Sequence, residues 1–478
     1  MNSSPLHRLT SQDFYDYDKC PHRVYLNHNG DEREKLPLSD FLNLLFESAL
    51  IYELKLAEKL TFQSPEGKTL EEQAESTRRL MAAGAERIYQ GVLLFPTDSG
   101  RPDLLEKVSG KSSFGDYFYK PVDIKNGSGY KDEERGTLRN DYALQLYHYA
   151  IMLNQIQGTF PPVAEILNQK GRRVLYDMNV YAADYAAEMP EVRALVDGRS
   201  SDEPVLSSIC TQCQWFGHCE PLLVKANDVS LLPDIGRSKR TNLKNFGVVS
   251  IQDVPKFDFK SNKIPGFGPK TVESISRNAR VVLSGNMEVI QKQKLPEPPL
   301  TIFFDFEDDP TQDLIYLAGF LFEPMRGKKD YHYIFEPDVA NEPKLWAELQ
   351  ALFADIAKED FVVFHYGSYE KGKLTQFEKK YGVTEQAALE LFRNRMVDLN
   401  TVVERTVALP TRNYSLKTVG RFIGFKYSSV EAGGAQSIAW FQEYQADQTK
   451  KDLLETLLTY NEEDCRALRA VRDWLVKL

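Results

Sequence analysis

The segment LTIFFDFEDDP, residues 300–310, is the part of the sequence that most directly indicates a fold. Its apolar run predicts a buried β-strand that ends in acids, with Asp305 and Glu307 two residues apart. Side chains two apart in a strand point to the same face, so we expect these two carboxylates side by side. The segments LIYLAGFLF and FVVFHYG predict further strands, and a last helix is expected from about Lys450. This pattern indicates an α/β domain.

The same region supplies two more acids and a tyrosine. The segment FVVFHYGSYEKGKL offers Glu370 after a predicted strand, and YNEEDC places Tyr460 and Asp464 one helical turn apart. Four acids of this kind can hold two divalent ions, which clamp the attacking and leaving oxygens of a phosphodiester. A tyrosine hydroxyl beside them can position the attacking water. The region therefore predicts a centre for phosphodiester hydrolysis.

These motifs resemble those of the ribonuclease-H-like DEDD 3′–5′ exonucleases of the tyrosine subtype. The resemblance implies Asp305 and Glu307 as the first motif, Glu370 as the second, and Tyr460 and Asp464 as the third. It also implies that the four acids bind Mg²⁺ or Mn²⁺. The family has Asp where this sequence has Glu370, and the longer side chain is expected to change the rate or the metal preference.

A second set of acids lies in the N-terminal half, in the segments GRPDLLEK, KPVDIKNG and ALQLYHYA. Asp103 accompanies one predicted strand, and Asp123 and Lys125 stand two apart in the next, on one face. Two carboxylates can bind a hard divalent cation, and a nearby lysine can orient or help deprotonate a water. Gln145 and Tyr149 share one face of a predicted helix, from which both can reach the lysine or nucleic acid.

The order Pro-Asp, D-x-K and Q-x-x-x-Y resembles the RecB-like group of PD-(D/E)XK nucleases. The resemblance implies Asp103, Asp123 and Lys125 as catalytic residues, with both aspartates as metal ligands. It implies Gln145 and Tyr149 as the group's Gln-x-x-x-Tyr motif. A solvated charge is the alternative for each residue taken alone.

The RecB-like group often has an acid or a histidine on an upstream helix as a further metal ligand. The segment FLNLLFESALIYELKLAEKL, residues 41–60, is apolar at helical spacing and contains two such acids. Glu53 is the expected metal ligand, and Glu47 is the second candidate. The segment EEQAESTRRLMAAGAERIYQG, residues 71–91, predicts another helix.

Five cysteines are present, and three of them, Cys210, Cys213 and Cys219, lie within ten residues. Cys20 can supply a fourth thiolate and so join the two ends of the N-terminal region. This arrangement resembles the iron–sulfur RecB-like nucleases and implies a 4Fe–4S cluster with a structural role. Zinc is the alternative, since four thiolates suit both metals. Cys465 is expected to be a small buried hydrophobic residue.

The sequence predicts three regions: a restriction-endonuclease-like α/β core over 1–230, a small basic helical hairpin over 231–295, and a ribonuclease-H-like α/β domain over 296–478. The middle region has 12 Lys and Arg against 5 Asp and Glu, although the whole chain has a net charge of −10. Its segment IPGFGPKTVESI, with Gly266 and Gly268 in the turn, resembles a helix-hairpin-helix that contacts phosphate. A purely structural connector is the alternative.

The composition, 42% hydrophobic and 27% charged, is that of a soluble globular protein. The apolar runs are too short to span a bilayer and the first residues lack a signal peptide, so we expect a cytoplasmic protein. The order of regions resembles that of bacterial RecB-like nucleases and implies a nuclease with two carboxylate centres. DNA is the favoured substrate and RNA the alternative, with a separate helicase as a conceivable partner.

Three other interpretations stay open at this stage. One centre could be active while the other only binds. The protein could instead be a non-catalytic nucleic-acid scaffold, or a redox sensor built on its cysteines.

Overall fold

A computed structural model of the protein describes residues 7–57, 60–133, 135–326, 329–428 and 434–478. The chain forms two compact units. The first comprises Met1–Leu38, Leu42–Pro204 and Ser208–Glu220, and the second comprises Ser39–Phe41, Val205–Ser207 and Pro221–Leu478. The basic segment 231–295 thus belongs to the same unit as the C-terminal region. No helix in the described ranges is both long and apolar enough to cross a membrane.

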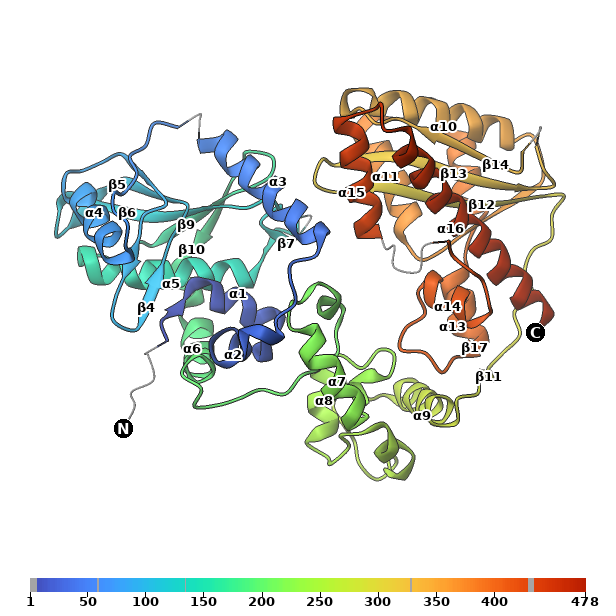
Figure 1. Ribbon diagram of the computed structural model, residues 1–478, viewed down its shortest axis with the longest axis horizontal. Coiled ribbons are helices and arrows are strands. Elements are labelled where there is room, and N and C mark those ends of the chain that lie inside the picture. Colours follow the sequence, from blue (N-terminus) through green and yellow to red (C-terminus); the bar gives the residue numbers. More distant parts are fainter. Residues whose placement is uncertain (1–6, 58–59, 134, 327–328, 429–433) are drawn as a thin grey trace. The chain divides into compact units, whose positions relative to one another are not determined.

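The N-terminal unit is built on a five-stranded sheet in the order β10-β9-β6-β5-β2 (Figure 1). The central strand β6 pairs antiparallel with β5 and parallel with β9. The elements of this unit are β1 Leu9–Thr10, α1 Ser11–Lys19, α2 Pro21–Asn29, α3 Asp40–Ala57, α4 Leu70–Ala82, β2 Arg87–Tyr89, β3 Leu93–Leu94, β4 Asp98–Gly100, β5 Leu104–Ser112, β6 Gly115–Ile124, β7 Tyr130–Asp132, β8 Thr137–Leu138, α5 Asn140–Gln157, β9 Val163–Leu167, β10 Arg173–Asp177 and α6 Ala182–Val196, with α7 Phe216–Ala226 following. The mixed α/β architecture predicted from the sequence is confirmed, and the restriction-endonuclease-like assignment stays a prediction.

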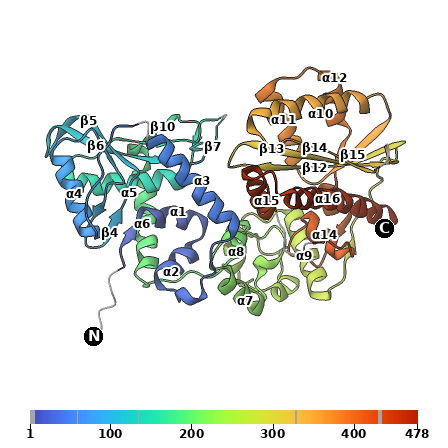
Figure 2. The same cartoon turned by 45° about the horizontal axis from the view of Figure 1, so that its top comes forward.

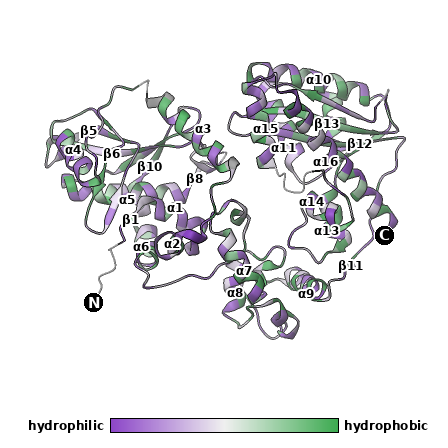
Figure 3. Ribbon diagram, in the orientation of Figure 1, coloured by the Kyte–Doolittle hydropathy of each residue, from purple (hydrophilic) through white to green (hydrophobic). Residues whose placement is uncertain are grey.

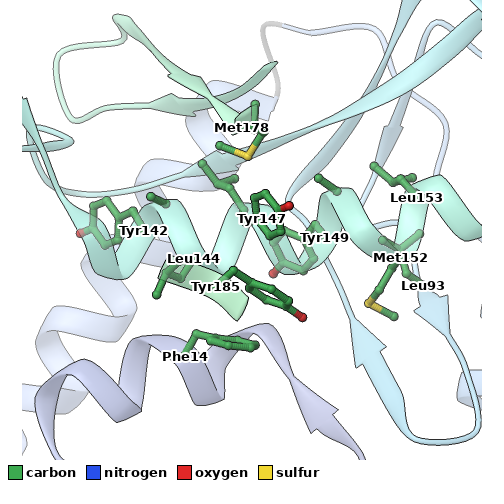
Figure 4. Close-up of a cluster of buried hydrophobic side chains, with 14 of the residues drawn as sticks. Phe14, Leu93, Tyr142, Leu144, Tyr147, Tyr149, Met152, Leu153, Met178 and Tyr185 are labelled. Carbon is green, nitrogen blue, oxygen red and sulfur yellow. The ribbon is translucent and has the colours of Figure 1, made fainter. Parts of the chain in front are cut away.

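Helix α5 is the centre of the hydrophobic core of this unit. It packs against β6, and its aromatic side chains are buried. Figure 4 shows Tyr147 of α5 beside Tyr185 of α6, which in turn stacks on Phe14 of α1 with 5.0 Å between ring centroids. Helices α1 and α6 pack against α5, which itself lies against the strand that carries Asp123.

The helix predicted over 71–91 is only partly present. Helix α4 ends at Ala82, Gly84 adopts a left-handed φ of +75°, and the chain then forms strand β2. The prediction failed at this end because apolar Ile88 pairs with Leu105 at the edge of the sheet, a long-range contact that overrides local helical spacing.

The C-terminal unit contains a second five-stranded sheet, in the order β14-β13-β12-β15-β16. Strand β12 pairs antiparallel with β13 and parallel with β15. The elements around this sheet are β12 Leu300–Asp309, β13 Leu314–Glu323, β14 Tyr331–Phe335, α10 Glu342–Ile356, β15 Phe361–His365, α11 Tyr369–Tyr381, α12 Gln386–Asn394, β16 Met396–Asp398, α13 Leu399–Thr406, β17 Val407–Ala408, α14 Leu416–Phe422, α15 Gly434–Ala446 and α16 Lys451–Lys477. Helices α10 to α12 cover one face and α15 and α16 lie against the other (Figure 2).

The central strands of this sheet are buried on both faces. Phe304 of β12 packs with Trp346 on the side of α10, whereas Phe303 packs with Leu468 on the side of α16. A strand with two buried faces needs a continuous apolar run, and β12 and β13 carry one (Figure 3). The acids of β12 therefore stand out as polar groups in an apolar layer.

The basic segment forms short helices around a small apolar core of its own. These helices are α8 Arg237–Lys244 and α9 Pro269–Ser284, followed by the short strand β11 Glu288–Val289. Gly266 has a left-handed φ of +78° just before α9. Lys263 and Lys270 are exposed, whereas Arg277 forms an ion pair with Glu273. Exposed lysines beside a helix N-terminus are compatible with the predicted contact to phosphate.

Gly319 of β13 lies where helix α16 approaches the sheet most closely. A Cβ atom at this position would lie 1.6 Å from Oδ1 of Asn461. We expect Gly319→Ala to lower the free energy of unfolding by about 1–3 kcal/mol, as overpacking does in rigid cores. Gly372→Ala is the matched control, because nothing lies within 4 Å of its added Cβ in helix α11, so it should stabilise by up to about 1 kcal/mol. Equal effects in thermal denaturation would contradict this account.

Candidate metal centres

Three carboxylates meet at the end of strand β12. The ligand oxygens of Asp305, Glu307 and Asp464 all lie within 4.8 Å of one another. The strand supplies the first two on one face, and helix α16 supplies the third from 157 residues further along the chain. In the described part of the chain this is the one group of three or more acids, histidines or cysteines that meets that spacing.

Burial makes this cluster electrostatically costly without a cation. Burial raises the pKa of Asp305, and the charges of Glu307 and Asp464 raise it further. Burial and the charge of Asp464 raise the pKa of Glu307 to about 8, and burial raises the pKa of Asp464 to about 6. The cluster therefore holds protons more firmly than ordinary carboxyl groups do, as expected for acids that share a site.

Hydrogen-bond donors hold two of these carboxylates in place. Asn461 donates from Nδ2 to Oδ2 of Asp305 at 2.8 Å, and Ser437 of α15 donates to Oε2 of Glu307 at 2.9 Å. Neither residue is predicted by the sequence motifs. Asn461 follows Tyr460 in the YNEED motif, a position that could have drawn attention, whereas no sequence signal marks Ser437.

Tyr460 is held by a lysine that the sequence motifs do not mark either. Nζ of Lys417 in α14 lies 2.7 Å from Oη of Tyr460 and 4.1 Å from the centre of its ring. Burial lowers the pKa of Lys417, although the charges of Asp464 and Glu307 oppose that shift. The lysine thus orients the predicted water-positioning tyrosine beside the acids.

The fourth predicted acid lies near this group but outside the 4.8 Å spacing. Glu370 is buried at the start of α11, and its Oε2 lies 3.2 Å from Nδ1 of the buried His365. Its charge contributes to the raised pKa of Asp305, so the two carboxylates are neighbours. Asp398, across from His365, caps helix α13 through the amide of Asn400. The role predicted for Glu370 stays a prediction.

The N-terminal unit brings its predicted residues together as well. A pocket of about 400 Å³ is lined by the five predicted catalytic residues, Asp103, Asp123, Lys125, Gln145 and Tyr149, whereas the predicted metal ligand Glu53 is not part of its lining. The first precedes β5, the next two lie at the end of β6, and the last two project from α5. Their catalytic roles stay predictions, but the sequence motif corresponds to one place in the structure.

Charge is partly balanced in this pocket. Nζ of Lys125 lies 3.0 Å from Oδ2 of Asp123, and the amide of Ile124 donates to Oδ2 of Asp103 at 2.6 Å. Burial raises the pKa of Asp103, and the charge of Asp123 adds to the shift. Burial lowers the pKa of Lys125, but the two aspartates outweigh it and the net shift is upward. Lys125 is therefore protonated while it faces the acids.

The motif on α5 leaves a polar atom in the pocket without a partner. Gln145 is buried, and nothing among the described residues donates a hydrogen bond to its Oε1. Tyr149 is buried too and donates weakly to the carbonyl of Arg101 at 3.3 Å. A buried, unpartnered oxygen beside two carboxylates suits a ligand or water that enters the pocket.

The upstream acid comes from helix α3. Oε1 of Glu53 accepts from Oη of Tyr89 at 2.8 Å and from Nε2 of Gln90 at 2.6 Å. Its charge also contributes to the raised pKa of Asp103, so the two carboxylates are neighbours. The second candidate, Glu47, is exposed.

The four predicted cysteine ligands lie in the same unit. The pKa of Cys219 is raised to about 12, by burial first and then by the charges of Cys213, Cys20 and Cys210. The four thiols are therefore near one another, yet they do not meet the 4.8 Å spacing of the carboxylates. Cys465 is fully buried in the core of the C-terminal unit, as expected from the sequence.

The RNase_H superfamily model matches residues 302–476, which include the second sheet and the three clustered carboxylates. Residues 302–476 thus form a ribonuclease-H-like domain, as the sequence predicted. The match covers less than half of the chain and does not extend to the N-terminal unit. No curated protein matches the chain.

The raised pKa values predict how pH affects the metal-free protein. The folded state binds protons at Glu307 and Asp464 more tightly than the unfolded chain, whose ordinary values are 4.5 and 3.8. The resulting stability is present below about pH 4 and is lost as pH rises through about 6 and 8. In thermal melts with EDTA, the melting temperature of Glu307→Gln should therefore rise relative to that of wild type as pH increases from about 4 to about 8.

Divalent metal should reverse this difference. At a concentration of Mn²⁺ about 100 times its dissociation constant, wild type should gain about 2.7 kcal/mol and Glu307→Gln much less. Parallel pH profiles for the two proteins, or an equal response to Mn²⁺, would contradict a metal centre at these carboxylates.

Proposed function

We propose that the protein is a metal-dependent nuclease whose C-terminal domain hydrolyses phosphodiester bonds. The observation that carries this proposal is the cluster of half-buried Asp305 with buried Glu307 and Asp464, within 4.8 Å of one another in a ribonuclease-H-like domain. A scaffold that only bound nucleic acid would have no use for three mutually repelling acids withdrawn from solvent.

The donor set fits hard divalent cations. Carboxylate oxygens are the ligands that Mg²⁺ and Mn²⁺ prefer, and a cation would offset the repulsion that raises the pKa values of Glu307 and Asp464. When bound, such ions supply an activated water and stabilise charge on the phosphate. Asp305, Glu307 and Asp464 would hold them, with Glu370 next to Asp305 as the fourth predicted ligand.

Around that site the chain would position the water and the strand. The hydroxyl of Tyr460, fixed by Lys417, would orient the attacking water beside the carboxylates. Asn461 and Ser437 would keep Asp305 and Glu307 aimed at the reaction site. The resemblance to the DEDD exonucleases is the ground on which we propose 3′–5′ trimming of DNA, with RNA as the alternative substrate.

The N-terminal pocket is proposed as a second hydrolytic centre of the RecB-like kind. Asp103 and Asp123, with Glu53 nearby, would hold a divalent ion, and protonated Lys125 would orient the water and balance charge on the phosphate. Its support is that the complete sequence motif lines one pocket of about 400 Å³. Gln145 would use its unpartnered oxygen to accept a hydrogen bond from water or substrate.

The four cysteines are proposed to hold a 4Fe–4S cluster. Four sulfurs around one zinc, at about 2.3 Å each, would lie about 3.8 Å apart. No three of the described thiols lie within 4.8 Å of one another, so the 4Fe–4S assignment rests on the resemblance to iron–sulfur RecB-like nucleases, with zinc as the alternative. Their placement in one unit, from Cys20 to Cys219, fits a structural clasp.

The nuclease proposal predicts separable activities. Full-length protein, purified without oxygen, is incubated with Mn²⁺ and end-labelled single-stranded DNA, duplex DNA and RNA. Asp123→Ala and Asp305→Ala should each remove a different part of the products, by about 100-fold or more, because each removes charge stabilisation at one centre. The double variant should lose all cleavage.

Exposed acids in the same strand or unit provide the controls. Asp116→Asn changes a carboxylate at the other end of β6, and Asp360→Asn changes one in the C-terminal unit. Both should cleave like wild type. If only one of the two alanine variants matters, a single centre is active. If wild type leaves all substrates intact but binds them in EDTA, the scaffold interpretation replaces this proposal.

The cluster proposal has its own test. Cys213→Ser should lose iron, sulfide and visible absorbance and should melt at a lower temperature, because the clasp between distant segments is opened. Cys465→Ala, which changes a cysteine in the other unit, should keep the full metal content. Zinc in place of iron in wild type, measured by elemental analysis, would contradict the 4Fe–4S assignment.

A further inference from the structure

Gln90, in the turn after strand β2, connects Asp103, which lines the N-terminal pocket, with Glu53, a neighbouring acid outside the lining of that pocket. Its Nε2 donates to Oε1 of Glu53 at 2.6 Å and to Oδ1 of Asp103 at 2.9 Å. One amide group therefore spans the gap between a carboxylate on helix α3 and a carboxylate at the start of strand β5. Neither the family motifs nor the sequence pattern marks this residue.

The backbone of Gln90 is strained in this position. Its φ is +54°, in the left-handed region that favours glycine, and glutamine is rarely found there. The backbone amide of Gln90 also donates to the carbonyl of Asp103 at 2.9 Å, so the turn is tied to the same residue twice. Strain of this kind tends to be retained at functional sites.

The hydrogen bonds to these acids leave room for a cation. A carboxylate oxygen has two lone pairs, so Oδ1 of Asp103 can accept from Gln90 and still face an ion. Oε1 of Glu53 accepts from both Gln90 and Tyr89, so the other oxygen of that carboxylate, Oε2, is the atom that can face an ion. Tyr89 also donates to Glu53 at 2.8 Å, which fixes that side chain from a second direction. Carboxylates that bind metals are commonly held by hydrogen bonds of this type.

We propose that Gln90 is a positioning residue for divalent metal at the N-terminal centre. Its amide sets the spacing between Glu53 and Asp103, and so couples helix α3 to the metal site. This inference rests on the function proposed for that pocket. It names a residue on which metal affinity depends although it need not touch the metal.

Gln90→Gly separates this role from a structural one. Glycine removes the amide but relieves the backbone strain, so the melting temperature should stay the same or rise. The affinity for Mn²⁺ should nevertheless fall by about 10- to 100-fold, the usual effect of losing a hydrogen bond to a metal ligand. Gln90→Leu, which keeps the side-chain size, should show the same loss of affinity.

The experiment is calorimetric titration of Mn²⁺ into full-length protein. All samples carry Asp305→Asn and Asp464→Asn to silence the C-terminal centre, and Asp103→Asn defines the baseline without the N-terminal site. Tyr89→Phe is the matched control, because it removes one donor to Glu53 but leaves both hydrogen bonds of Gln90. Its affinity for Mn²⁺ should therefore fall less than that of Gln90→Gly.

The outcomes distinguish this inference from the function on which it rests. If the protein with intact Asp103 binds no more Mn²⁺ than the baseline, the proposed N-terminal centre fails and this inference fails with it. If the protein with intact Asp103 binds Mn²⁺ and Gln90→Gly has a dissociation constant within twofold of its value, only the role of Gln90 is overturned. Tighter binding by Gln90→Gly would show that the amide competes with the metal, which also overturns the proposal.

Discussion

Repulsion between carboxylates buried at the end of strand β12 is the constraint around which the C-terminal domain is arranged. The apolar faces of β12 are covered by helices on both sides, so Asp305 and Glu307 cannot be hydrated as surface acids are. Helix α16 brings a third acid, Asp464, into the same place. The fold thus concentrates negative charge in a setting where a cation has the strongest effect.

The two centres balance that charge in different ways. In the N-terminal pocket the upward pKa shift of Lys125 keeps its positive charge beside Asp123. In the C-terminal domain burial outweighs the acids and lowers the pKa of Lys417, whose Nζ donates to Oη of Tyr460. The lysine of the first pocket is thus paired directly with a carboxylate, whereas that of the second holds the tyrosine beside the acids.

Both sites depend on a close approach between backbone and side chain. The sheet tolerates α16 only because Gly319 has no side chain, and this approach lets Asn461 reach Asp305. In the other unit, an unfavourable backbone at Gln90 lets one amide reach both Glu53 and Asp103. In each case a side-chain amide orients a carboxylate. Asn461 can do so only beside a glycine, and Gln90 only with a strained backbone.

The sequence by itself determined the strands and the acids on them, because apolar runs and two-residue spacing are local properties. It predicted the ribonuclease-H-like domain and five of the residues that line the N-terminal pocket. Only the tertiary structure decided what holds those residues: Lys417 against Tyr460, His365 against Glu370, and Gln90 between two acids. Lys417 and Tyr460 are 43 residues apart and Glu53 and Gln90 are 37 apart, so tertiary packing brings these pairs together. His365 and Glu370 are close in the sequence, but only the turn between β15 and α11 makes their side chains meet.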